Sequence, residues 1–89
     1  MKITFDPAKN RANIDKHGVS FSDAAELDWE NALVWLDARN DHGEPRQSAL
    51  GELNGRIFSV AFVDRPDGRR IISLRKANLR EVKYYDEQT

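Results

Sequence analysis

The run Arg56–Val63 constrains the fold more than any other segment, because after its first residue it is apolar on both parities apart from Ser59. A strand with apolar residues on both faces is buried on both sides, which places it in the middle of a sheet. Asn54-Gly55 precedes the run and is a strong signal for a two-residue hairpin turn. Pro66-Asp67-Gly68 follows it and predicts a second tight turn. The sequence therefore predicts antiparallel partners on both sides of a central strand.

With the flanking segments included, the sequence predicts an α+β domain. Its elements are expected in the order β-α-α, an antiparallel meander of three or four strands, and a C-terminal helix, with the helices packed on one sheet face. Asp6-Pro7 predicts the start of a first helix that ends at Gly18. A second helix begins at Ser20 or Ser22. The other expected elements are a short strand at 2–6, strands at 32–36, 46–53 (with a bulge at Gly51) and 70–74, a polar loop at 37–45, and a helix from residue 76 onward.

The length of 89 residues allows one domain, residues 1–89, with a single core. The absence of cysteine excludes disulfides and thiolate sites. The N-terminus lacks the apolar run of a signal peptide, and no stretch approaches the length of a membrane span, so a cytoplasmic location without membrane contact is expected. A net charge of −1 argues against a protein that coats nucleic acid without specificity.

Positive charge is concentrated in the last third of the chain. Residues 56–83 include eight basic and three acidic side chains, whereas the first 44 residues include five basic and nine acidic ones. The planar, permanently charged guanidinium group suits bidentate contact with phosphate. A phosphate-facing surface is therefore the first hypothesis. The alternative is that each arginine lies at a strand end and pairs with a nearby carboxylate.

Strand alternation divides this basic block. It places Arg70 and Arg75 on opposite faces of the last strand. Helical spacing then gathers Lys76, Arg80 and Lys83 into one basic stripe on the terminal helix. Tyr85, on the same helix, has two interpretations, base stacking or half-buried packing.

The acid–base candidates are not distinctive. His17 fits the end of the first helix and His42 lies in the predicted polar loop. The remaining candidates are Glu44, Glu52, Glu81, Lys76 and the tyrosines. No metal-binding motif and no glycine-rich phosphate loop is present, so neither a metal nor a cofactor is expected.

Three blocks of residues form one pattern: Phe5-Asp6, Lys9, Asn13, Lys16 to Phe21 and Ala24; a looser middle of Glu44, Arg46, Gly51 and Arg56; and Arg70 to Ser73, Arg75, Ala77, Glu81 and Tyr85. The helix end Lys16-His17-Gly18 and the run Arg70 to Ser73 are specific in combination. This pattern resembles the BrnT family of toxins from type II toxin–antitoxin systems over nearly the full chain. The resemblance implies a fold like that of the RelE ribonucleases. It also implies a metal-independent RNA-cleaving toxin that is neutralised in a hetero-oligomer by a cognate small DNA-binding antitoxin. The toxin would then contact DNA only indirectly, through the antitoxin.

We therefore expect arginines to clamp a scissile phosphate, with the ribose 2′-hydroxyl as nucleophile. Arg75 and Arg70 are the first choices, followed by Arg56 and Arg46. Glu81 or Lys76 would assist proton transfer or hold an arginine, and Arg80 and Tyr85 would contact RNA. Two alternatives stay open at this point. One is a non-catalytic module whose basic surface docks an acidic partner segment, and the other is DNA binding through the terminal helix.

Overall fold

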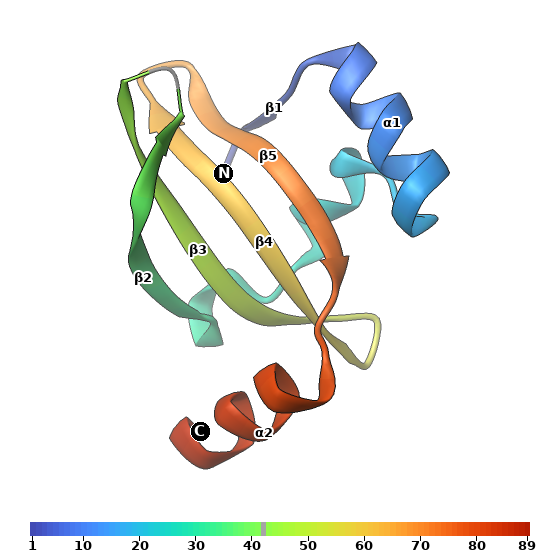
Figure 1. The fold of residues 1–89 in the computed structure, drawn as a ribbon, viewed down its shortest axis with the longest axis vertical. Coiled ribbons are helices and arrows are strands. Elements are labelled where there is room, and N and C mark those ends of the chain that lie inside the picture. The colour runs from blue at the N-terminus through green and yellow to red at the C-terminus, as the bar shows by residue number, and fades with distance from the viewer. Residues whose placement is uncertain (42) are drawn as a thin grey trace.

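The computed structural model describes residues 1–41 and 43–89, with the side chains of residues 40 and 41 left out. It contains β1 (Ile3–Thr4), α1 (Pro7–His17), two short 3-10 helices η1 (Phe21–Glu26) and η2 (Trp29–Asn31), β2 (Leu33–Asp41), β3 (Glu44–Leu53), β4 (Arg56–Arg65), β5 (Gly68–Lys76) and α2 (Leu79–Gln88). The five strands form one mixed sheet in the order β1-β5-β4-β3-β2 (Figure 1). The predicted α+β class is confirmed.

The meander forms as its turn signals predict. β2 to β5 pair antiparallel in sequence order. Asn54 and Gly55 adopt φ values of 51° and 79°, which a two-residue hairpin turn requires. β4 is the buried central strand, flanked by β3 and β5. The short β1 adds a parallel edge strand beside β5, so the sheet is mixed, whereas the sequence predicted only antiparallel pairing.

The core lies on one face of the sheet, under the 3-10 helices, whereas α1 lies beside β5 at the edge of the sheet (Figure 1). Phe21 and Phe62 are 1% and 0% exposed there, from η1 and β4 respectively. Gly51 does not mark a bulge, because the register of β3 with β4 continues through it. It permits close packing instead, since a Cβ atom at this position would lie 2.9 Å from Leu27 Cδ2.

The predicted helix boundaries hold for α1. Asp6 caps its N-terminus by accepting a hydrogen bond from the backbone N–H of Ala8 at 2.8 Å. Gly18 ends it with a φ of 72°. Ser20 is the N-cap of the next helical segment, which is a six-residue 3-10 helix. No helix in the described part of the chain is long and apolar enough to cross a membrane.

Two predicted segments are wrong. The polar stretch 37–45, predicted as a loop, is strand at 37–41 and 44–45, because β2 extends to Asp41 and β3 begins at Glu44, whereas Gly43 is in a turn; His42 lies outside the described residues. The terminal helix begins at Leu79 and Lys76 ends β5, so the expected stripe of Lys76, Arg80 and Lys83 on one helix does not form.

The prediction that all helices pack on one sheet face is also wrong for α2. This helix lies beyond the end of the sheet where β5 finishes (Figure 1). Its carboxylate Glu81 bonds Arg75, which lies on the face away from the core.

Asn13 links α1 to β5 and is the one described polar side chain that is buried, at 7% exposure. Its amide nitrogen donates to the carbonyls of Val19 and Leu74 at 3.0 and 2.8 Å. Its amide oxygen accepts from the N–H of Leu74 at 3.3 Å. The side chain therefore satisfies both backbone groups of Leu74 on the side of β5 that β4 does not cover, as a neighbouring strand would.

Candidate functional site

One extra residue in β5 decides which side chains reach the open face of the sheet. Ser73 pairs with Ala61, but the next pair along joins Ile71 to Phe62. Ile72 therefore has no partner on β4, which is the arrangement of a β-bulge. The side-chain alternation of β5 changes parity at this point.

The bulge brings Arg70 and Arg75 to the same face. Ile71 and Leu74, three residues apart, both belong to the core. Arg70 precedes the first of them, and Ser73 and Arg75 flank the second, so all three lie on the opposite, open face. The expectation that Arg70 and Arg75 lie on opposite faces is therefore wrong, because strict alternation does not continue through a bulge.

The open face carries a cleft of about 540 Å³. Its floor is formed by small side chains on β3, β4 and β5, which leave room above the sheet. The lining residues are Trp35, Leu36, Asp37, Ala38 and Arg39 of β2; Arg46 and Ser48 of β3; Ser59 and Ala61 of β4; Ser73 and Arg75 of β5; and Glu81 of α2.

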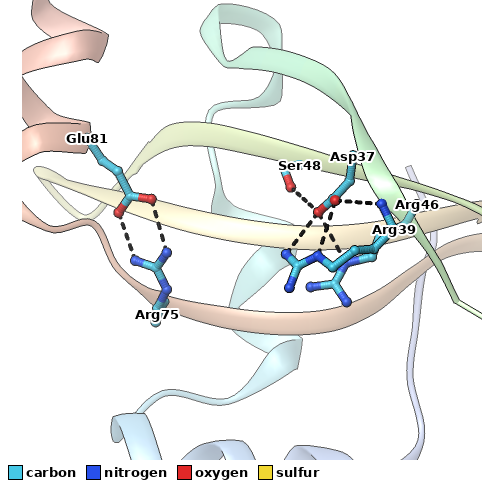
Figure 2. A network of polar contacts seen from close by, with 6 residues as sticks. All are labelled: Asp37, Arg39, Arg46, Ser48, Arg75 and Glu81. Carbon is cyan, nitrogen blue, oxygen red and sulfur yellow. Dashed lines mark hydrogen bonds and ion pairs between the residues drawn. The ribbon is translucent and has the colours of Figure 1, made fainter.

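Arg75 and Glu81 form a bidentate ion pair at one end of this cleft (Figure 2). The two terminal nitrogens of Arg75 donate to the two oxygens of Glu81 at 2.8 and 3.0 Å. The hydrogen bonds from Arg75 hold the pKa of Glu81 below its usual value, and the backbone N–H of Asn78 adds to this. Glu81 is therefore a fixed anion, and the same carboxylate closes the capping box of α2 with Asn78.

A second charged cluster surrounds Asp37 at the other end (Figure 2). Its carboxylate, 11% exposed, accepts from the backbone N–H of Arg39 at 2.9 Å and from that guanidinium at 3.1 and 3.3 Å. Ser48 donates a further hydrogen bond, and Arg46 Nε lies 3.6 Å away. The hydrogen bonds from Arg39, with the charges of both arginines, hold the pKa of Asp37 far below its usual range. Arg46 Nε is buried and has no hydrogen-bond acceptor within the described residues.

The residues that line the cleft have a net positive charge even when these ion pairs are included. Its lining contains three guanidinium groups and two carboxylates, which leaves a charge of +1. The Nε–Nη2 edge of Arg75 carries no hydrogen bond to another described residue apart from the one that Nη2 donates to Glu81. An anion is therefore the ligand that this arrangement favours.

A comparison with protein families shows which family the chain resembles. Residues 5–81 match the family model described as "Ribonuclease toxin, BrnT, of type II toxin-antitoxin system". The chain belongs to the BrnT family. A search of the curated proteins found no match. The matched range includes both ends of the cleft, from Asp37 and Arg46 to Arg75 and Glu81.

The cleft of this BrnT domain contains only some of the residues that the sequence singled out. Arg46, Arg75 and Glu81 line it. Arg70 shares the open face and pairs with Val63, but it is not among the lining residues. Neither are the other predicted site residues: Arg56 at the start of β4, Lys76 at the end of β5, and Arg80 and Tyr85 on α2.

Several of the basic and aromatic residues outside the cleft pack against other side chains or form ion pairs. Arg69 lies over the rings of Trp29 and Phe62, with its guanidinium carbon 4.6 and 4.2 Å from their centroids. It also forms a bidentate pair with Asp64. Tyr85 has a raised pKa because of burial, with the charges of nearby carboxylates adding to the effect. His17 is the last residue of α1, half-buried and away from the cleft.

Sequence reasoning missed Trp35, Asp37, Arg39 and the three serines of the floor. The signal that would have found them is polar alternation: Asp37 with Arg39, Arg46 with Ser48, and Ser73 with Arg75 are each two residues apart on a strand. Among the described residues, no group of three or more His, Asp or Glu side chains is arranged to hold a metal ion.

Proposed function

We propose that this BrnT domain is a metal-independent endoribonuclease that binds a single RNA strand across its open sheet face. The observation that carries the proposal is the cationic cleft with Arg75 at one end and Arg46 at the other. Phosphate contact through arginine supplies affinity without reading sequence. The ribose 2′-hydroxyl distinguishes RNA from DNA and supplies the nucleophile.

Arg75 is the residue that contacts the scissile phosphate. Glu81 holds its terminal nitrogens, so the guanidinium is oriented before substrate arrives and presents the Nε–Nη2 edge. Charge develops on the phosphate oxygens as the 2′-oxygen loses its proton to solvent and attacks phosphorus, and the 5′-oxygen leaves and takes a proton from solvent. A preorganised donor stabilises that charge without reorganising. The products are a 2′,3′-cyclic phosphate and a 5′-hydroxyl.

Arg46 binds a neighbouring phosphate of the same strand. It lies on β3 four residues before Leu50, and Leu50 and Arg75 both pair with Ser59. Ordinary sheet spacings then put the Cα atoms of the two arginines about 16 Å apart. A strand held at both ends is fixed in register on the sheet, which lowers the entropic cost of reaching the reactive geometry.

Neither carboxylate of the cleft suits proton transfer near neutral pH. The pKa values of Asp37 and Glu81 are both lowered by the arginines that they contact. An efficient general base has a pKa near the working pH. We therefore assign both carboxylates to positioning the guanidinium groups, and charge stabilisation supplies the rate enhancement.

The antitoxin partner follows from the family. In a type II system the toxin is neutralised by a protein, and we propose a cognate small DNA-binding antitoxin whose acidic segment covers the cleft. The relationship to the RelE fold belongs to the same proposal. A non-catalytic binding module is the second candidate, and it is supported by the ion pairs that Arg46 and Arg75 form with the carboxylates of Asp37 and Glu81.

The test is RNA cleavage by the purified protein in EDTA, beside DNA of the same sequence. We expect cleavage of RNA only. Arg75→Ala is expected to lower the rate by about 10²–10³-fold. Arg11→Ala, at an exposed position of α1 outside the cleft, is the matched control and should cut normally. Full activity of Arg75→Ala would overturn the phosphate assignment. Absence of products with wild-type protein would favour the binding module.

A further inference from the structure

Trp35 is exposed inside the cleft, where a structural role does not account for it. It lies on the edge strand β2, pairs with Ser48, and is 42% exposed. Its indole makes no hydrogen bond and no aromatic ring contact with another residue in the described part of the chain. Trp29, the other tryptophan, donates a hydrogen bond from Nε1 to the Ala24 carbonyl at 2.9 Å and packs against Phe62. The two indoles therefore have different surroundings.

The position of Trp35 relative to Arg46 is fixed by the strand register. Trp35 pairs with Ser48, and Arg46 is two residues before that serine on the same face. Diagonal neighbours of this kind have Cα atoms about 7–8 Å apart, within reach of long side chains. A phosphate bound by Arg46 is thus one side-chain length from the indole.

The floor beside Trp35 leaves space for a planar group. Ser48, Ala61 and Ser73 continue the row from Trp35 across β3, β4 and β5. All three side chains are small and line the cleft. A flat ring lying beside the indole meets no bulky side chain along this row.

We propose that Trp35 is a stacking platform for one nucleobase of the RNA strand, the base next to the phosphate that Arg46 binds. An aromatic face beside a guanidinium is the combination by which proteins hold single-stranded nucleic acid. The inference rests on the proposed function, since it assigns the substrate that the cleft holds. It extends that function by giving the cleft a base subsite at the β2 end, away from Arg75.

The experiment measures binding without cleavage. The probe is a fluorescein-labelled 2′-O-methyl analogue of an RNA fragment that the wild-type protein cuts, read by anisotropy. Trp35→Ala is expected to weaken binding by about 5- to 150-fold, and Trp35→Phe by much less. Val34→Ala, its 47%-exposed neighbour on β2 outside the cleft, is the matched control and should bind normally. The salt dependence of Trp35→Ala should match that of wild type, whereas Arg46→Ala should reduce the slope by about 0.7.

An abasic scan locates the stacked base. One abasic position should weaken binding to wild type by the same factor as Trp35→Ala, and should cost nothing further in that variant. Wild-type affinity of Trp35→Ala, or additive losses, would overturn the stacking assignment while leaving cleavage intact. Loss of antitoxin binding alone would make Trp35 a partner contact and overturn it as well. Failure of the wild-type protein to cut RNA at all would instead defeat the proposed function.

Discussion

For the ion pair between Arg75 and Glu81, one substitution tests the contribution of the charge to stability without changing the length of the side chain. Glu81→Gln keeps the length of the side chain, and glutamine also closes a capping box at this position. The substitution therefore removes the charge while leaving the cap with Asn78 largely in place. The paired side chains are 37% and 24% exposed, so solvent screens the interaction. After that discount the bidentate pair contributes about 0.5–1 kcal/mol.

The pH dependence of this contribution has a definite sign. The pKa of Glu81 is lowered in the folded protein, first by the hydrogen bonds from Arg75. A lowered carboxyl pKa stabilises the fold above the ordinary glutamate value of about 4.3, and the stabilisation is lost as the pH falls through the folded value. The difference between wild type and Glu81→Gln should therefore be constant from pH 7 to about pH 5. It should disappear in stronger acid, where the carboxyl group is neutral.

Thermal unfolding followed by circular dichroism measures this difference. For a domain of this size about 1 kcal/mol corresponds to roughly 4–8 °C in Tm, so Glu81→Gln should unfold about 2–8 °C lower at pH 7. Glu87→Gln, on the exposed last turn of α2, controls for the loss of one acidic charge and should change little. A Tm difference that is the same at pH 7 and pH 3 would refute the ion-pair account. So would additive effects of Glu81→Gln and Arg75→Gln in a double-mutant cycle.

Two further predictions concern the framework of the cleft. Asn13→Ala leaves the backbone N–H and carbonyl of Leu74 without their side-chain partner, so it should cost about 2–4 kcal/mol by denaturant unfolding; unchanged stability would mean that water replaces the amide. Gly51→Ala places a Cβ atom 2.9 Å from Leu27 Cδ2 and 3.3 Å from Ala32 Cβ, and should cost about 1–3 kcal/mol. Combining it with Leu27→Ala should remove most of that extra cost, and strict additivity would show that the contact is not the cause.

The sequence predicts the buried part of this fold well, because burial imposes patterns on the chain. β4 is apolar on both parities, and its two turns carry the residues that tight turns need. The prediction of a loop is wrong for residues 37–41, for the opposite reason. The residues of this segment are those common in turns, yet Asp37 lies on a strand whose side chains face a polar cleft. At such positions function replaces the apolar alternation by which a strand is recognised.

The irregularity of β5 is the step that sequence alternation does not reveal, and the arrangement of the cleft depends on it. Without the unpaired Ile72, the residues after it would exchange faces: Leu74 would leave the core and Arg75 would enter it. The bulge lies two residues before Leu74, whose backbone groups Asn13 holds at the edge of β5 that β4 does not cover. Glu81 holds the guanidinium of the next residue from the open side. Arg75 is therefore held by α2 through Glu81 and follows a residue that α1 holds through Asn13, so its position depends on the whole fold and not on its own strand alone.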